Sequence, residues 1–411
     1  MTLISLSGLA PFDRRGHQRR LIVDALRRAR RASRAELAAA TGLSAQMVTL
    51  LVEELLTEGL VVELGRRQAA RGQPPIDMGL NPEGGFAIGL QIDRGSVTGL
   101  LADLETTIRS QERVLCSTDD PASALAEIRA LVDRLVVSSG VERARIWGAG
   151  VVLPGPFGPA AGRDDPLTMP AWTQQDFIPA YAAALGCPVI VGNDATAAAI
   201  GEHLDGVARD LRSFVYLYLG EGIGGGIFVD DRPLTGAFGN AGEIGRMLVA
   251  DPDTAAPVAL ESIASISALR DLLRCGGCEA AMSAEPDSLL DMAPALLDRW
   301  YRRAAAALQS AIVNLENLLD PEAIVLGGPL PTRALVRLAA ALEPLPSSVS
   351  RRGDRAHPRL LIARSGRSSS ALGGATLPLF RALSPQPRAA RIARRRSLPP
   401  APKTQPSGLR Q

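Results

Sequence analysis

The spacing of apolar residues in the first eighty positions predicts three short helices followed by a β-hairpin. Apolar residues recur with helical spacing over 17–29 and again over 48–55. Residues 33–36 read Ser-Arg-Ala-Glu, the spacing of a capping box that starts a helix. Short apolar runs at 60–64 and 76–80 flank a loop rich in glycine and arginine, as paired strands do. This order of elements is typical of a winged helix-turn-helix.

Beyond a boundary at 81–84, apolar runs of strand length alternate with amphipathic stretches of helix length. The expected strands are 86–92, 97–104, 146–153, 189–191, 214–219 and 324–326. The expected helices are 121–137, 176–185, 196–203, 287–319 and 368–381. Strands that alternate with helices indicate an α/β fold.

Composition and charge narrow the class of protein. The 411 residues allow two or three domains, and a net charge of +2 means that any basic surface must be local. No apolar run reaches the length of a membrane span, and four cysteines in a chain this long do not make a disulfide framework. We therefore expect a cytoplasmic protein that makes no contact with a membrane.

The first unit, residues 14–80, has side chains suited to reading double-stranded DNA. Its third helix should enter the major groove, where Gln46 can pair with adenine edges and Ala45 or the methyl group of Thr49 can contact a thymine methyl. Arginines in the hairpin loop are placed for phosphates or a narrow minor groove. The predicted DNA contacts are Ser44, Ala45, Gln46, Thr49, Arg66, Arg67 and Arg71.

Further arginines make the segment 14–34 locally basic. They are Arg14, Arg15, Arg19, Arg20, Arg27, Arg28, Arg30, Arg31 and Arg34. Basic residues that gather where a duplex would lie favour DNA binding. The alternative is that this unit contacts only protein and that its arginines form a solvated face.

A glycine-rich segment follows the strand 214–219. We expect a turn over Gly220–Gly226 and then a second strand. Glycines this dense let the backbone approach a ligand closely, and a phosphate group is the usual one. A glycine-rich hairpin without a ligand is the alternative.

More specific motifs surround this segment. Gly239–Arg246 reads GNAGEIGR, with Asn193-Asp194 upstream and Leu260-Glu261 downstream. From about His17 to about Phe380 the chain resembles the ROK family, which contains sugar kinases, and repressors built on the same sugar-binding body.

The resemblance implies a two-lobed, actin-like (ribonuclease-H-like) body of the sugar-kinase type behind the winged helix-turn-helix. The small lobe is expected at 82–203 plus 365–383, and the large lobe, with the sugar pocket and oligomer contacts, at 204–364. Residues 384–411 are rich in Pro and Arg and lack an apolar period, so we expect a disordered basic tail.

The resemblance also places Asp194 at the family's general-base position. Carboxylates and amides suit sugar binding because they accept from or donate to pairs of vicinal hydroxyls. The implied sugar-binding residues are Asn193, Asp194, Glu243, Arg246 and Glu261, and the remnant of the phosphate loop is Gly222, Gly224 and Gly225. Taken alone, Asn193-Asp194 also fits a helix cap.

The other phosphate loop departs from the family pattern. The family's kinases open the small lobe with Asp-x-Gly-Gly-Thr, and the aligned residues here are Gln91-Ile92-Asp93-Arg94-Gly95. Side chains in place of both glycines block the close approach of a phosphate, and Asp93 repels it. We therefore expect weak or absent ATP turnover, no catalytic residue and no nucleotide cofactor.

The family's zinc ligands are also replaced. Its histidine aligns with Arg246, and the following segment, 251–261, contains no cysteine. Cys275-Gly276-Gly277-Cys278 lies beyond that segment without a second ligand pair, so we expect no metal. Arg246 either gives the pocket a preference for an anionic ligand, or pairs with Glu243 or Asp251.

Together these features predict a sequence-specific transcriptional regulator, a repressor, rather than an enzyme. Its partners would be double-stranded operator DNA and a sugar or sugar derivative, and two-fold DNA sites favour a homodimer or homotetramer. Sugar binding would close the lobes and shift the DNA-binding heads. Two alternatives stay open. One is an active ATP-dependent sugar kinase fused to a DNA-binding domain, and the other is a regulator with an inactive pocket that responds to a protein partner.

Overall fold

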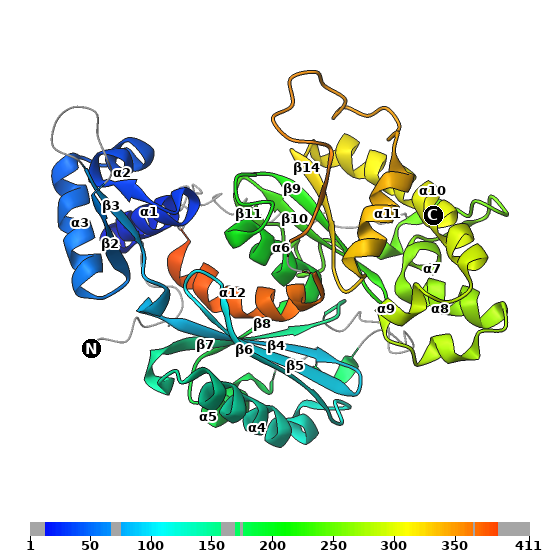
Figure 1. The fold of residues 1–411 in the computed structure, drawn as a ribbon, viewed down its shortest axis with the longest axis horizontal. Coiled ribbons are helices and arrows are strands. Elements are labelled where there is room, and N and C mark those ends of the chain that lie inside the picture. Colours follow the sequence, from blue (N-terminus) through cyan, green and yellow to red (C-terminus); the bar gives the residue numbers. More distant parts are fainter. Residues whose placement is uncertain (1–12, 67–74, 158–168, 173–175, 365, 385–411) are drawn as a thin grey trace, which may run out of the picture.

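The computed structural model of the chain describes residues 13–66, 75–157, 169–172, 176–364 and 366–384 (Figure 1). A small N-terminal head lies at one end, beside a body that contains two larger sheets. The strands of the head sheet have the order β1-β3-β2. The head elements are α1 (Arg14–Ala29), β1 (Ala32–Ser33), α2 (Arg34–Thr41), α3 (Ala45–Thr57), β2 (Val61–Arg66) and β3 (Ile76–Leu80).

The ends of the head helices confirm the predicted capping residues. The Ser33 hydroxyl accepts from the Glu36 backbone N–H at 3.3 Å, and the Glu36 carboxylate accepts from the Ser33 N–H at 2.8 Å. At the start of α3, the Ser44 hydroxyl accepts from the Met47 N–H. Gly59 follows this helix with a φ of +74°, the left-handed conformation that commonly ends helices.

The first body sheet has five strands in the order β6-β5-β4-β7-β8. They are β4 (Phe86–Asp93), β5 (Ser96–Asp103), β6 (Ile108–Leu115), β7 (Ile146–Leu153) and β8 (Val189–Asn193). Helices α4 (Pro121–Ser139) and α5 (Ile178–Leu185) cover one face and bury an apolar cluster against it (Figure 1). The sequence analysis did not predict β6, because this edge strand buries few side chains and carries charged ones (IRSQERVL).

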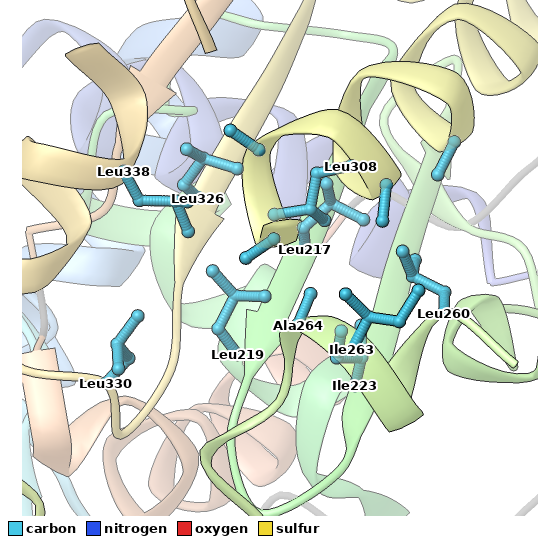
Figure 2. Packing of buried hydrophobic residues seen from close by; sticks show 14 of the residues in the cluster. Leu217, Leu219, Ile223, Leu260, Ile263, Ala264, Leu308, Leu326, Leu330 and Leu338 are labelled. Atoms are coloured by element: carbon cyan, nitrogen blue, oxygen red, sulfur yellow. The ribbon is translucent and has the colours of Figure 1, made fainter. Parts of the chain in front are cut away.

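The second body sheet has the strand order β11-β10-β9-β14-β15. Its strands are β9 (Phe214–Leu219), β10 (Ile223–Val229), β11 (Arg232–Pro233), β14 (Ala323–Gly327) and β15 (Leu360–Ile362). One face packs against α7 (Glu261–Ala264), α8 (Ile266–Cys275), α10 (Pro294–Leu319) and α11 (Thr332–Leu342). Figure 2 shows Leu217 and Leu219 of β9 close to Leu308 of α10 in this core. The short helix α9 (Pro286–Leu289) and a hairpin of β12 (Leu248–Ala250) and β13 (Pro257–Ala259) complete the body.

Two helices fill the space between the body sheets (Figure 1). They are α6 (Asp194–Asp205) and α12 (Ser369–Leu383). Small residues let α6 and α12 touch backbone to backbone, since a Cβ on Gly373 would fall 2.6 Å from the Ala198 nitrogen. The expected lobe boundary between 203 and 204 falls inside α6, whose apolar side chains pack with β9 and β10. The lobe ranges stay a prediction, and residues 385–411 of the predicted tail lie outside the described residues.

The glycine-rich segment differs from the expected turn. The turn covers only Gly220, Glu221 and Gly222, because β10 already begins at Ile223 and pairs with β9. Gly224–Gly226 are therefore strand residues. A Cβ on Gly226 would fall 2.8 Å from the Ala195 carbonyl oxygen, and one on Gly224 would fall 2.8 Å from the Ala195 Cβ. These glycines allow α6 to lie directly on β10, a packing reason that the sequence analysis did not consider.

Within the described part of the chain, no single helix has both the length and the apolar character to cross a membrane. The bent pair α2 and α3, at 114°, passes that test of length and composition when the two are joined. Both helices pack in the apolar cluster of the head.

Candidate functional site

A cleft of about 700 Å³ lies where the carboxyl ends of strands from both body sheets face each other. Asp93 ends β4, Pro154 follows β7 and Asn193 ends β8 on one side. Glu221 follows β9 and Pro329 follows β14 on the other side. Ligands of open α/β sheets bind outside these carboxyl ends, so the topology marks the cleft as a binding site.

The cleft brings together all five predicted sugar-binding residues, Asn193, Asp194, Glu243, Arg246 and Glu261. Asn193 caps α6 by accepting from the Thr196 N–H at 3.0 Å. This residue is therefore both the helix cap and part of the cleft wall. Glu243 lies opposite Asn193. A Cβ on Gly155 would fall 2.6 Å from Glu243 Oε1 and 3.0 Å from Asn193 Nδ2. Two segments far apart in the sequence thus place a carboxylate and an amide on the same side of Gly155.

Glu261 is held at the cleft by the core of the second sheet. Its neighbour Leu260 is fully buried, and Ile263 and Ala264 anchor the same short helix, α7, as Figure 2 shows. The Glu261 carboxylate accepts from the Ile223 N–H at 3.3 Å. This contact ties α7 to the start of β10, which follows directly on Gly222 of the predicted phosphate loop.

Asp194 holds its proton unusually tightly. Its pKa is raised to about 7, chiefly by burial; the Ala195 N–H lowers it in part, and the nearby carboxylates of Asp93 and Glu243 add to the rise. The Ala195 N–H donates to Asp194 Oδ1 at 2.7 Å. A carboxyl group that titrates near neutral pH can both donate to and accept from a hydroxyl, or act as a general base.

The segment Gln91–Gly95, which the sequence analysis matched to the kinase phosphate turn, lies at a tight β-hairpin. Asp93 pairs with Ser96, and only Arg94 and Gly95 make the turn. The Gln91 amide donates to Asp93 Oδ2 at 3.1 Å, and both side chains line the cleft together with Arg94. Burial also raises the pKa of Asp93. A carboxyl group and a guanidinium thus enter the cleft from this hairpin.

Arg246 lies at the rim of the cleft with Glu243, and their side chains approach to 3.5 Å. This is one of the two pairings considered in the sequence analysis. The other candidate partner, Asp251, accepts from Arg303 of α10 at 2.8 Å. The Asp251 contact fastens the β12–β13 hairpin to α10.

No three His, Cys, Asp or Glu side chains are arranged to hold a metal ion among the residues that the structure describes. Cys275 is exposed and Cys278 is partly buried, and neither forms a disulfide.

Several cleft residues were missing from the sequence analysis. The Asn240 amide donates to the Phe157 carbonyl at 2.9 Å and accepts from the Phe157 N–H at 2.8 Å. This pair of bonds joins the segment after β7 to the GNAGEIGR segment across the cleft. The side chain of Arg113 contacts that of Glu285 at 3.2 Å at another part of the cleft wall. Asn240 lies within a quoted motif and could have been found, whereas Arg113 lies on the unpredicted strand β6.

Carboxylates outnumber arginines among the described side chains that line the cleft. The carboxylates belong to Asp93, Asp194, Glu221, Glu243, Glu261 and Glu285, and the guanidiniums to Arg94, Arg113, Arg246 and Arg270. Most of these arginines pair with a carboxylate of the cleft, such as Arg270 with Glu221 at 3.0 Å. Such a surface suits a neutral ligand rich in hydroxyl groups better than a polyanion.

In the head, the predicted reading residues of α3 lie on its outer face. Ser44, Ala45, Gln46 and Thr49 are exposed, while Val48 packs into the core on the opposite side. The Thr49 hydroxyl donates to the Ala45 carbonyl at 2.9 Å, which leaves its methyl group for an outside contact. Arg66 ends β2 and is exposed. Arg67 and Arg71 lie outside the described residues.

Most arginines of the locally basic segment 14–34 have partners within the protein. Arg15 pairs with Glu54 in the last turn of α3, and Arg19 pairs with Glu58, the residue that follows this helix. Four others contact the body. Arg20 donates to the Ala382 carbonyl, Arg27 to the His203 and Leu204 carbonyls, Arg28 to Asp231, and Arg30 pairs with Asp205. Most of this segment therefore holds the head together or attaches it to the body.

Comparisons with known proteins agree with this architecture. The model of the ROK family matches residues 87–379, which include both sheets of the body and the cleft. The chain belongs to the ROK family. The match begins just after the head, so the head itself is an addition to the family domain.

Relatives matched over half of the chain or more include one protein of uncharacterised function and several repressors. The chain is 30% identical over 368 residues to the uncharacterised protein y4fQ of Sinorhizobium fredii, a match that covers 88% of this chain and 91% of that protein. It is 27% identical over 225 residues to the xylose repressor of Bacillus spizizenii, which covers 53% of this chain and only 56% of that repressor.

Two solved structures, one of a ROK regulator and one of a ROK kinase, share the fold of this chain. A ROK transcriptional regulator described as a homologue of the Escherichia coli MLC protein superposes with a TM-score of 0.65 at 24% identity, over 89% of this chain and 98% of that chain. A ROK glucokinase from Streptomyces griseus, solved with glucose and AMPPNP, superposes with a TM-score of 0.53 at 25% identity, over 71% and 99%. The larger share covered by the regulator includes the head.

Proposed function

We propose that this chain is a sequence-specific DNA-binding transcriptional regulator, a repressor, whose cleft senses a sugar. The proposal rests on the presence of a candidate DNA-reading surface and a candidate sugar cleft in one chain. A winged helix-turn-helix exposes Ala45, Gln46 and Thr49, and it is attached to a body whose cleft gathers Asn193, Asp194 and Glu243. Support comes from relatives named as repressors, which match 53–72% of this chain, and from a solved ROK transcriptional regulator that superposes over 89% of it.

The sugar site can be tested with the purified chain. Thermal shift and calorimetry with D-xylose, D-glucose, N-acetyl-D-mannosamine and acidic sugars should show binding of at least one neutral sugar. Glu261→Gln should weaken that binding, because it replaces a charged acceptor by an amide that donates where the sugar also donates. Glu279→Gln, outside the cleft, is the control. A chain that binds no sugar in a broad panel would favour a regulator that responds to a protein partner.

The same titrations decide what Arg246 does. Its contact with Glu243 offsets its charge, so we propose that neutral sugars bind more tightly than sugar acids. The opposite order would support the reading of Arg246 as an anchor for an anionic group. Equal affinity for both classes would contradict both assignments.

DNA binding can be tested by selecting duplexes from a random library at physiological salt and measuring affinity by fluorescence anisotropy. We expect a preferred sequence with two related half-sites, because a dimer with two heads reads two-fold DNA. Light scattering should therefore show at least a dimer. A chain that binds all duplexes equally would contradict the proposal.

An active kinase is the second candidate. Asp194 supports it, because a carboxyl group with a pKa of about 7 suits a general base. Against it, the side chains of Asp93 and Arg94 occupy the first phosphate turn. We propose that phosphate transfer is absent. An ATP-consumption assay over the sugar panel, with a known glucokinase as the positive control, separates the two. Turnover at ordinary enzyme rates, above about 1 per second, would establish the kinase.

A further inference from the structure

Helix α6 connects the cleft to the head. Its cap, Asn193, and its first residue, Asp194, line the cleft. Its last residues lie against α1 of the head. With 12 residues, the helix is a rod of about 18 Å at about 1.5 Å per residue. One short element therefore reaches from two candidate sugar ligands to the DNA-reading unit.

This helix is enclosed along its length. Its residues from Ala197 to Leu204 are all buried, between α12 on one side and β9 and β10 on the other. Small residues make the contacts close, since a Cβ on Gly226 or on Gly373 would come within 3 Å of the α6 backbone. Closely packed helices move as rigid bodies rather than bend, so a displacement at Asp194 is passed to the other end of α6.

Arg27 of α1 holds the far end of α6. Its guanidinium donates to the His203 carbonyl at 3.0 Å and to the Leu204 carbonyl at 2.6 Å. These carbonyls belong to the last turn of α6. The carbonyl groups of a last helical turn have no N–H donors within the helix and attract positive charge. Asp24 accepts from Arg27 at 2.7 Å and orients it, and the side chain of Arg27 is only 11% exposed. Arg30 adds a second link by pairing with Asp205.

The neighbouring helix α12 ends on α1 in the same way. Arg20 Nε donates to the Ala382 carbonyl at 3.0 Å, in the last turn of α12. Arg20 and Arg27 are seven residues apart, about two helical turns, and so share one face of α1. Figure 1 shows the end of α12 reaching α1. Two packed helices of the body thus end on one helix of the head, each through an arginine bound to its terminal carbonyls.

We propose that Arg27 is the positioning residue that passes a sugar-driven movement of α6 to the head. This inference rests on the proposed function, because it requires a sugar to bind at Asn193 and Asp194. Closure of the cleft displaces α6, and the two carbonyl contacts of Arg27 make α1 follow. The orientation of α3 then changes with α1, because both pack in one core with Val23, Leu26 and Leu51.

Amide hydrogen exchange of the full chain, followed by mass spectrometry, tests the coupling. The probes are D-xylose, D-glucose and N-acetyl-D-mannosamine at saturating concentration. The variant is Arg27→Met, which keeps an apolar stem and removes the donors. The matched control is Arg19→Met on the same helix, whose partner Glu58 belongs to the head. Arg27→Lys is the second variant if Arg27→Met does not fold, because it keeps the charge but lacks the separate nitrogens with which Arg27 binds Asp24 and the two carbonyls at once.

The proposal expects a sugar to slow exchange at 194–205 and to change exchange at 14–29 in the unmodified chain. In Arg27→Met the effect at 194–205 should remain and the effect at 14–29 should vanish, while Arg19→Met should keep both. A response at 14–29 that survives in Arg27→Met overturns the proposal. So does a sugar that protects 194–205 but never affects 14–29 in the unmodified chain.

The failure of the proposed function is distinguishable from the failure of this inference. If none of the three sugars changes exchange at 194–205, the sugar site fails for these probes, and the ligand-free samples decide the coupling. Arg27→Met must then speed exchange both at 198–205 and at 14–29, whereas Arg19→Met leaves 198–205 unchanged. Equal exchange at 198–205 in the two variants overturns the role of Arg27.

Discussion

Asp194 shows how the cleft changes the chemistry of a single residue. Its pKa of about 7 lies above its usual 3.8, chiefly because of burial. The folded chain therefore holds this proton more tightly than the unfolded chain does. The stability that the protonated group contributes is fully present below about pH 4 and is lost as the pH rises to about 7.

Asp194→Asn should remove this loss. We expect the variant to gain stability over the unmodified chain at pH 8, by at most about 4 kcal/mol since one pKa unit corresponds to about 1.4 kcal/mol. The gain should shrink toward zero near pH 4. Urea unfolding at both pH values measures it, and Asp210→Asn, at an exposed site, is the control. A gain that does not depend on pH would contradict the shifted pKa.

The arginines of the first thirty residues differ in the groups that they contact. A basic residue on a helix can face DNA, a carboxylate or a helix end, and its position in the sequence does not distinguish these partners. Arg20 and Arg27 lie in the same basic segment as Arg14. Only the packing of α1 against the body turns Arg20 and Arg27 toward carbonyl groups.

Among the elements, the contact between α6 and β10 depends on the absence of side chains. Gly226→Ala would place a Cβ 2.8 Å from the Ala195 carbonyl oxygen, which cannot move without shifting the helix. We expect a loss of about 1–3 kcal/mol in the free energy of unfolding, as for other overpacked cores.

Urea unfolding of Gly226→Ala measures that loss. Gly353→Ala is the matched control, because a Cβ there meets nothing within 4 Å, and its effect should stay within about 0.5 kcal/mol. Equal stability of the two variants would show that α6 is not packed on β10 as described.

For the whole molecule, two head residues should affect DNA binding in different ways. Gln46→Ala should weaken binding to the selected duplex by about 1–3 kcal/mol and relax the preference at one base pair. Arg66→Ala should weaken binding to all duplexes alike and reduce the salt dependence if Arg66 contacts phosphate, the first of its two predicted roles. Anisotropy titrations on the selected duplex and on single-base variants separate these outcomes. A uniform loss from Gln46→Ala would remove it from base reading.

Much of this molecule could be read from local patterns. The caps at Ser33 and Ser44, the end of α3 at Gly59 and most body strands follow from residues that are near one another in the chain, because capping and periodicity act over a few positions. The five cleft residues came from ordered motifs, and the structure brings them into one cleft. Whether they bind a sugar stays a prediction.

Contacts between distant segments could not be read in this way. The edge strand β6 carries little hydrophobic signal, the glycines of β10 are needed for packing on α6, and Arg27 meets carbonyls 176 and 177 residues away. Such partners depend on how sheets and helices stack. The amino-acid sequence alone therefore specified the helices and strands and the side chains available for chemistry. The tertiary structure, with α6 and α12 stacked between two sheets, then decided which of these groups face each other. The reason is that burial and hydrogen bonds between distant segments are not encoded at any single position.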